Sequence, residues 1–453
     1  MLDTIIALDV GAQITKAAMA YKDEDGALQI LGYGVANTSG FANGCVQDMD
    51  ELSKSIYNAI DNLQEKYEVD INPFEMPIFY SISGDSLNSR NIQTEMRRIK
   101  NIDQETQSGK VSQEDIKWLK TDLETYASNI LVKDMRQITI IPQCYQIDNE
   151  AGIKNPNMMY GKEIKAAGLF ITDNIHHILN LECAIEKALS EFDENIQKSD
   201  LKLVPIAASI ASAMAVLNDD YNEIGVAILD IGKDCCDLAV YYQNFPILIW
   251  SQKFAGAEIT KEIKKFLTIP SKEAEEIKKK YACAAPQKAG RKETIEVSGN
   301  RMVSLESLAQ WVNEPVRNMF ENVDNVLGSN FDGSTYKSNI SQILITGGTA
   351  NLKEIALVGQ EVLELPVKIA TPDCFKVNEE FKQMNDDVSF ATLMGLCIYG
   401  TQDYSFEEKN TTGKKPKKKN VSKVKSQGNF VDKMKKSFGE IIESVKNIKL
   451  NVD

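Results

Sequence analysis

Two segments, one in each half of the chain, repeat a single pattern. Residues 6–21 read IALDVGAQITKAAMAY, and residues 227–242 read AILDIGKDCCDLAVYY. In each segment an apolar run ends in Asp, a Val or Ile and Gly, and a short turn leads to a second apolar run. This pattern predicts a strand, a tight turn and a return strand. Because an internal repeat constrains the whole fold, we expect a duplicated α/β domain with a cleft between its halves.

Further strands and helices are expected in alternation along both halves, as α/β architecture requires. The predicted strands are 76–83, 137–147, 166–172, 245–254, 341–347 and 366–371. The predicted helices are 50–67, 174–192, 206–217, 257–267, 271–281, 304–327, 351–364 and 388–399. The stretch 84–163 interrupts the first half and contains a polar helix-like run, 112–131, so we expect it to be an inserted subdomain.

The adjacent Cys235 and Cys236 in the second turn leave three interpretations open: a cysteine site, a nucleotide loop or a plain hairpin. The chain has eight cysteines but no C-x-x-C motif, and its two histidines are the neighbours His176 and His177. Zinc-ligand spacing is therefore absent. Free thiols in a reducing compartment are expected.

Turns of this kind, between a strand that ends in Asp and its return strand, can bind phosphate. Successive backbone N–H groups form a concave anion site, and an Asp at the strand end can hold the water shell of Mg²⁺. Gly347 and Gly348 form a third such position, between a strand and a helix, where an anion can approach the helix N-terminus. One such hairpin taken alone is weak evidence, whereas two at matching positions are much stronger. For the Gly347-Gly348 junction alone, an ordinary turn is an equally good explanation. Glu275 and Lys278 similarly share one helical face, where a solvated salt bridge is the simpler explanation.

Four further segments stand in a distinctive order between these motifs. They are GYGVANTSGFANGCVQDMDEL (32–52), NPNMMYGKEIKAAGLFIT (155–172), AEEIKKKYACA (274–284) and VNEPVRNMF (312–320). With the two hairpins and the strand–Gly-Gly–helix junction, they make residues 4–400 resemble the FtsA family of bacterial cell-division proteins. That family belongs to the actin-like ATPase superfamily.

The resemblance implies an ATP/ADP site with Mg²⁺ in the cleft. Asp9 and Asp230 would face the water shell of the Mg²⁺. The implied nucleotide-binding residues are Gly11, Ala12, Gln13, Lys16, Gly232, Lys233, Asp234, Cys235, Gly256, Glu275, Lys278, Gly347 and Gly348. Cys235 would then be a small turn residue near the phosphates and not a metal ligand.

Three departures from the family pattern concern catalysis. Lys233 and Asp234 stand where the second loop is usually glycine-rich, and Ala257 replaces a second glycine. Val204 occupies a position where many relatives with ATPase activity carry Glu, and valine cannot orient an attacking water. We therefore expect at most a slow ATPase, with a turnover below roughly 1 s⁻¹, and primarily a nucleotide-binding structural adaptor.

The resemblance also implies the domain organisation of actin-like duplicated ribonuclease-H-like domains around a nucleotide cleft. Subdomain 1A would comprise 1–83, 164–203 and a closing helix at 388–400, with an SHS2-like subdomain 1C inserted at 84–163. Subdomain 2A would comprise 204–268 and 328–387, with subdomain 2B between them at 269–327.

The C-terminal region differs in composition from the rest of the chain. From Lys409 to Asp453 it carries 13 Lys and four acidic residues, although the net charge of the whole chain is −14. Residues 401–428 predict a disordered basic linker. Residues 429–450 predict an amphipathic helix, whose apolar face comprises Phe430, Met434, Phe438, Ile441, Ile442, Val445 and Ile448.

Such a helix, preceded by a lysine-rich linker, fits the surface of an anionic lipid membrane. From the residues alone, docking on the protein's own body or on a partner is an equal alternative, and the family resemblance favours the membrane. We expect no signal peptide, because LDTIIALDVG follows Met1 directly. No apolar run approaches the roughly 20 residues of a membrane-spanning helix.

The resemblance implies a protein that polymerises on the cytoplasmic face of the inner membrane at the division site. It would tether FtsZ filaments through the C-terminal peptide of FtsZ and recruit later division proteins, with no nucleic acid involved. Arg301 and Arg317 in subdomain 2B are candidates for contacting that peptide, although solvated arginines explain them as well. Two alternatives are a pilus-assembly scaffold of the same fold and a small-molecule kinase of the superfamily.

Overall fold

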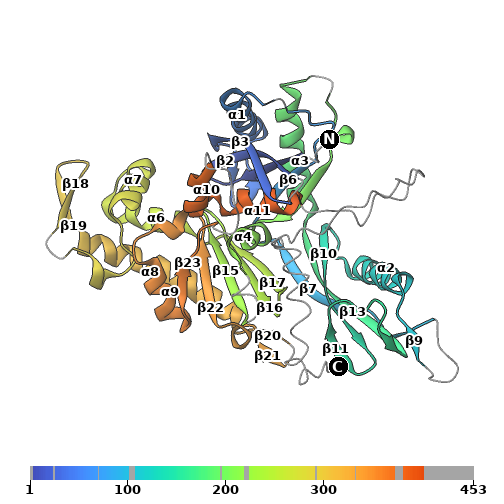
Figure 1. The fold of residues 1–453 in the computed structure, drawn as a ribbon. Coiled ribbons are helices and arrows are strands. Elements are labelled where there is room, and N and C mark those ends of the chain that lie inside the picture. The colour runs from blue at the N-terminus through green and yellow to red at the C-terminus, as the bar shows by residue number, and fades with distance from the viewer. Residues whose placement is uncertain are drawn as a thin grey trace.

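Two five-stranded sheets, one in each half of the chain, form the centre of the molecule (Figure 1). The computed structural model describes residues 4–401 except 24–25, 70, 101–107, 194–195, 219–223, 291–292, 332 and 373–380. The first sheet has the order β14-β6-β1-β2-β3. Its strands are β1 (Ile5–Val10), β2 (Ile14–Lys22), β3 (Leu28–Asn37), β6 (Ile78–Ile82) and β14 (Leu203–Ala207).

The second sheet repeats the topology of the first. Its order is β17-β16-β15-β22-β23. Its strands are β15 (Val226–Ile231), β16 (Cys236–Tyr242), β17 (Phe245–Gln252), β22 (Gln342–Thr346) and β23 (Val367–Ile369). In both sheets three antiparallel strands are followed by two parallel ones. The predicted duplication is therefore confirmed, and each copy of the repeat is the first hairpin of its sheet.

Two helices, α4 (Ala208–Val216) and α11 (Ala391–Gly400), lie between the sheets (Figure 1). Both are apolar around nearly their whole circumference, as a helix buried on all sides must be. They approach closely, since a Cβ atom on Gly395 would lie only 1.7 Å from the carbonyl oxygen of Ala211. Together with the inner faces of β1 and β15 they form one core that joins the two halves.

Other helices cover the outer faces of the sheets. Helices α1 (Met49–Tyr67) and α3 (Ile175–Ser190) pack on the first sheet. The second half contains α6 (Gly256–Leu267), α7 (Ser271–Tyr281), α8 (Leu305–Leu327), α9 (Ile355–Leu363) and α10 (Lys382–Asp386). Short strand pairs are β4 (Phe41–Ala42) with β5 (Cys45–Val46), β18 (Thr294–Val297) with β19 (Arg301–Ser304), and β20 (Asn330–Phe331) with β21 (Ser334–Thr335).

The insertion in the first half folds around a core of its own. It contains β7 (Asn88–Gln93), β8 (Arg97–Arg98), β9 (Gly109–Lys110), α2 (Gln113–Ile130), β10 (Met135–Ile147), β11 (Glu150–Ile153), β12 (Tyr160–Gly161) and β13 (Glu163–Asn174). It also contacts the second half, because the Ser89 hydroxyl donates to the Ile249 carbonyl and accepts from its N–H, each at 2.8 Å. Asn91 donates to the Ile247 carbonyl at 2.9 Å, so side chains of β7 bind the edge of β17.

Every strand and helix predicted in the described residues is present, with bounds that shift by a few residues. The predicted helix 206–217 is wrong at its start, because Ile206 and Ala207 pair with β6 as the end of β14. Strands β3 and β7 were not predicted. The predicted linker beyond residue 401 and the helix 429–450, with its seven apolar membrane-binding candidates, lie outside the described residues. In the described part, none of the helices has the length and apolar character to cross a bilayer.

Candidate functional site

The two hairpin turns have the same hydrogen bonding. Gly11 N–H donates to the Ile14 carbonyl at 3.2 Å, and Gly232 N–H donates to the Cys235 carbonyl at 2.9 Å. Both turns are too tight for a side chain at the glycine, since a Cβ on Gly11 would lie 2.8 Å from that Ile14 oxygen. The repeat in the sequence is thus a repeat of turn geometry.

The turns line a cleft of about 740 Å³ between the two halves. Twelve of the thirteen residues predicted to bind nucleotide line it, as do Asp9 and Asp230. The exception is Gly256, which supports the second turn from behind, because its N–H donates to the Gly232 carbonyl at 3.2 Å. A Cβ there would lie 2.3 Å from the Thr349 hydroxyl, which itself donates to the Gly232 carbonyl at 2.7 Å.

In the first hairpin, both carboxylate oxygens of Asp9 bind neighbouring side chains. Lys16 lies opposite it in the β1–β2 register, and the Lys16 Nζ is 2.8 Å from Asp9 Oδ2. The Ser81 hydroxyl donates to Oδ1 at 3.0 Å. Both members of the ion pair are buried, so this carboxylate already has its cation within the protein.

In the second hairpin, Asp230 has hydroxyl partners, and it forms no ion pair with any residue that the structure describes. Ser212 and Thr392, from the two helices between the sheets, both donate to its Oδ2, Thr392 at 2.8 Å. Burial raises the pKa of Asp230. Its other oxygen faces Gly347, which has a φ of +84° and where a Cβ would lie 2.2 Å from Asp230 Oδ1. Glycine at this position therefore keeps the carboxylate open to the cleft.

Asp237 is a cleft residue that the sequence reasoning missed. It lies opposite Asp230 in the β15–β16 register, at the position that Lys16 holds in the first hairpin. Alignment of the two copies of the repeat relates Lys16 to Asp237 and could have identified it. Ser83 donates to Asp237 Oδ2 at 2.7 Å, while the buried Oδ1 has no hydrogen-bond partner in the described part of the chain. Burial, with the nearby charge of Asp230, raises the pKa of Asp237 to about 7.

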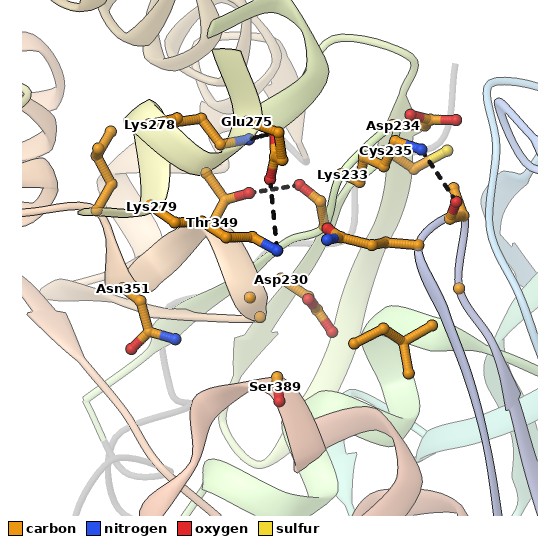
Figure 2. A pocket seen from close by; sticks show the side chains of 18 of the residues that line it. Asp230, Lys233, Asp234, Cys235, Glu275, Lys278, Lys279, Thr349, Asn351 and Ser389 are labelled. Carbon is orange, nitrogen blue, oxygen red and sulfur yellow. Dashed lines mark hydrogen bonds and ion pairs between the residues drawn. The ribbon is translucent and has the colours of Figure 1, made fainter. Parts of the chain in front are cut away.

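The two residues that depart from a glycine-rich loop both cross the cleft (Figure 2). Lys233 donates from Nζ to the Ala12 carbonyl in the opposite turn at 3.2 Å. The Asp234 Oδ2 accepts from the backbone N–H of Asn43, between β4 and β5, at 3.0 Å. These side chains connect the two halves at the point where the turns face each other.

Glu275 and Lys278 form the predicted i,i+3 pair on α7, but the pair lines the cleft and is not a solvated surface bridge. Lys278 Nζ is 2.7 Å from Glu275 Oε2 and donates to the Gly256 carbonyl at 3.0 Å. Burial lowers the pKa of Lys278. The pair therefore stands between α6, which supports the second turn, and the open cleft (Figure 2).

The adjacent cysteines are packing residues of the second hairpin. Burial raises the pKa of both the Cys235 and the Cys236 thiol, so each is protonated at neutral pH. Across the described residues, no group of three or more His, Cys, Asp or Glu side chains is arranged to hold a metal ion. A cation in this cleft would therefore keep its waters, and the unpartnered Asp237 Oδ1 beside Asp230 fits hydrogen bonding to such a water shell.

Two family models match the chain. The model described as "Cell division protein FtsA" matches residues 227–395, and "SHS2 domain inserted in FTSA" matches residues 88–172. Together they cover more than half of the chain, including the second hairpin and the insertion. The chain belongs to the FtsA family.

Curated FtsA proteins match over most of their length. The protein named cell division protein FtsA from Pseudomonas aeruginosa is 28% identical over 413 residues, which are 88% of this chain and 90% of that protein. The protein of the same name from Escherichia coli K12 is 26% identical over 411 residues, 88% of this chain and 91% of the relative. The chain is thus a cell-division protein of the actin-like family.

A solved structure supports the fold. The type IV pilus complex PilM–PilN includes a chain that superposes with a TM-score of 0.59 at 13% identity, covering 88% of this chain and 98% of that one. With the duplicated sheets and the matched SHS2 insertion, this confirms the predicted actin-like fold class. The domain boundaries stay predictions.

Val204, whose position was expected to bear on hydrolysis, lies in β14. Val204 pairs with Phe79 inside the first sheet and is not among the residues that line the cleft. The interpretation that valine at this position disfavours hydrolysis stays a prediction. The cleft-lining residue of this segment is Ala208, which has no carboxylate either.

The two arginines predicted to contact FtsZ are on separate elements and already have partners. Arg301, on β19, donates to the carbonyls of Ser298 and Leu267. Arg317, on α8, is 3.6 Å from Glu361 of α9, and both side chains are about two-fifths exposed. Peptide binding by these arginines stays a prediction.

Proposed function

We propose that this FtsA-family chain binds ATP in the cleft between the two hairpins and uses it as a conformational ligand. The observation that carries the proposal is the pairing of two glycine turns across one cleft of about 740 Å³. Both turns line the same space, and successive backbone N–H groups of such turns can bind phosphate oxygens. A cleft of this size is typical of small-molecule and cofactor sites.

The residues divide the cleft into a phosphate end and a nucleoside end. Gly11, Ala12 and Gln13 with Gly232 to Cys235 would hold the phosphates. Glu275 and Lys278 on α7, with Gly347 and Gly348 opposite, would contact the ribose and adenine. A bound Mg²⁺ would neutralise phosphate charge, and the water shell of the ion would face Asp230 and Asp237.

Slow turnover remains our expectation for this site. Both oxygens of Asp9 already have partners, Lys16 on Oδ2 and Ser81 on Oδ1. Asp237, with a pKa of about 7, is the described carboxylate best suited to act as a general base. It lies near the turn of the second hairpin and already accepts from Ser83.

The remaining parts of the proposal come from the family and from the tail. We propose that the chain polymerises on the cytoplasmic face of the inner membrane and tethers FtsZ filaments there. A weak lipid-binding helix repeated along a filament gains avidity without new contacts. The relatives are named as division proteins, which favours this role over a pilus scaffold or a kinase.

Calorimetric titration of the purified chain with ATP tests the nucleotide site. Wild type should bind, whereas Gly347→Ala should not, because the new Cβ would fall 2.2 Å from Asp230 Oδ1. Gly333→Ala is a matched control, since Gly333 also has a positive φ, of +77°, but no atom lies within 4 Å of its added Cβ. Absence of ATP binding by wild type would refute the site.

Electron microscopy on anionic lipid monolayers tests the adaptor role. With ATP, wild type should form filaments and recruit FtsZ, and the chain truncated before residue 429 should do neither on lipid. Failure of wild type to form filaments in any nucleotide state would refute this part while leaving nucleotide binding intact.

A further inference from the structure

We propose that Lys233 gives its charge to the terminal phosphate of the bound nucleotide, so that this cleft holds ATP with little dependence on Mg²⁺. The inference rests on the proposed nucleotide site and deepens it. It concerns a residue of this chain that departs from the glycine-rich loop, and it assigns that departure a role in binding.

The position of Lys233 is the first observation. Its Nζ bridges the second turn to the Ala12 carbonyl of the first at 3.2 Å. The ammonium group therefore stands between the two turns, where phosphate oxygens would lie (Figure 2). A carbonyl is a weak partner for an ammonium ion compared with a phosphate oxygen, so a nucleotide can replace this contact with a stronger one.

The second observation is that the two buried lysines of the cleft, Lys16 and Lys278, are already paired. Lys16 is held by Asp9 at 2.8 Å, and Lys278 by Glu275 at 2.7 Å. In the described part of the chain, Lys233 makes no ion pair. The charge of Lys233 is also felt by Lys278. Burial is the main cause that lowers the pKa of Lys278, and the positive charge of Lys233 lowers it further. Lys233 is thus a cation in the second turn that is available to an incoming anion.

The neighbouring Asp234 would oppose phosphate binding if it turned inward, and the structure holds it outward. Its carboxylate accepts from Asn43 N–H at 3.0 Å, on the β4–β5 hairpin. The two cross-cleft contacts therefore separate the adjacent charges, with the lysine toward the first turn and the aspartate toward the hairpin. This arrangement explains how an acidic residue is tolerated in a loop that receives an anion.

Among the described residues, the cleft offers few free carboxylate ligands for Mg²⁺, whereas Lys233 is available to bind phosphate. Asp9 has both oxygens occupied, and no described cluster of three ligands surrounds the cleft. The ammonium group of Lys233 in the second turn neutralises part of the negative charge of the triphosphate without Mg²⁺. We therefore expect the metal to add less to affinity here than in a cleft whose second loop has glycine at this position.

The test is calorimetric titration of ATP into the full chain, once with Mg²⁺ and once with EDTA. Wild type should lose less than about tenfold in affinity in EDTA. Lys233→Gly should lose a further tenfold to hundredfold in EDTA, which is the effect of one charge-assisted hydrogen bond worth about 1.5–3 kcal/mol. Lys233→Arg should behave as wild type, which also shows that the position tolerates substitution.

Lys279→Ala is the matched control for a lost charge on the cleft rim. Lys279 is 57% exposed and 3.8 Å from Glu275, so its removal should weaken binding equally in both buffers. If Lys233→Gly also responds equally in both buffers, the inference is wrong and the nucleotide site stands. If wild type binds ATP in neither buffer, the proposed function fails and the inference falls with it.

Discussion

Replacing Asp237 by Asn should make the folded chain more stable at alkaline pH than wild type. Asp237 is buried, and burial with the nearby Asp230 raises its pKa to about 7. In the unfolded chain an ordinary aspartate has a pKa of about 3.9. Between these two values the folded chain binds more protons than the unfolded chain, so the free energy of unfolding falls as the pH rises.

The size of the effect follows from the gap between the two pKa values. About three pH units at 1.36 kcal/mol each amount to about 4 kcal/mol lost between pH 4 and pH 7. Of this, about 2 kcal/mol falls between pH 5.5 and pH 7. Asn has a similar shape and does not titrate, and its amide can still accept from Ser83 and donate toward Asp230. The stability of Asp237→Asn should therefore not show this decrease as the pH rises.

Thermal unfolding of wild type and of Asp237→Asn, at pH 5.5 and at pH 8, measures this pH-dependent loss of stability. The difference in Tm between Asp237→Asn and wild type should grow by roughly 4 °C toward pH 8, at about 2 °C per kcal/mol for a unit of this size. Asp85→Asn is the control, because Asp85 lies beside the cleft with its side chain 53% exposed and paired with Lys253. A Tm difference that does not grow with pH, or that grows equally in the control, would refute the reasoning.

Three further changes test other parts of the structure. Lys16→Ala should cost about 3–5 kcal/mol in urea unfolding, because it leaves the buried Asp9 carboxylate without its cation; a cost below about 1 kcal/mol, the value of a surface pair, would contradict the burial of this pair. Gly395→Ala should destabilise by about 1–3 kcal/mol or more, because its Cβ would overlap the Ala211 carbonyl, and an unchanged urea midpoint would show that the helices can separate. Deleting 429–453 should abolish co-sedimentation with anionic vesicles, and unchanged binding would exclude the tail as the anchor.

Sequence reasoning succeeded where a local pattern carries the structure. The strand–turn–strand repeat depends on apolar runs and glycine, both visible within one short segment, and it was confirmed with its cleft. It failed for β3, whose apolar pattern is interrupted by glycines. Gly34 is needed because a Cβ there would lie 2.0 Å from the Ala59 carbonyl of α1. This reason appears only when the helix is in place.

For the candidate site, the repeat in the sequence predicted two turns facing one cleft, and the family resemblance supplied most of the lining residues, but neither identified Asp237. Tertiary structure decided how their charges are used. It pairs Asp9 with Lys16 but places Asp237 opposite Asp230, and it turns Lys233 toward Ala12 and Asp234 toward Asn43. The physical reason is the sequence distance between the residues that interact. A turn is specified by neighbouring residues, whereas the partner of a charge in the cleft depends on how segments from the two halves of the chain pack together.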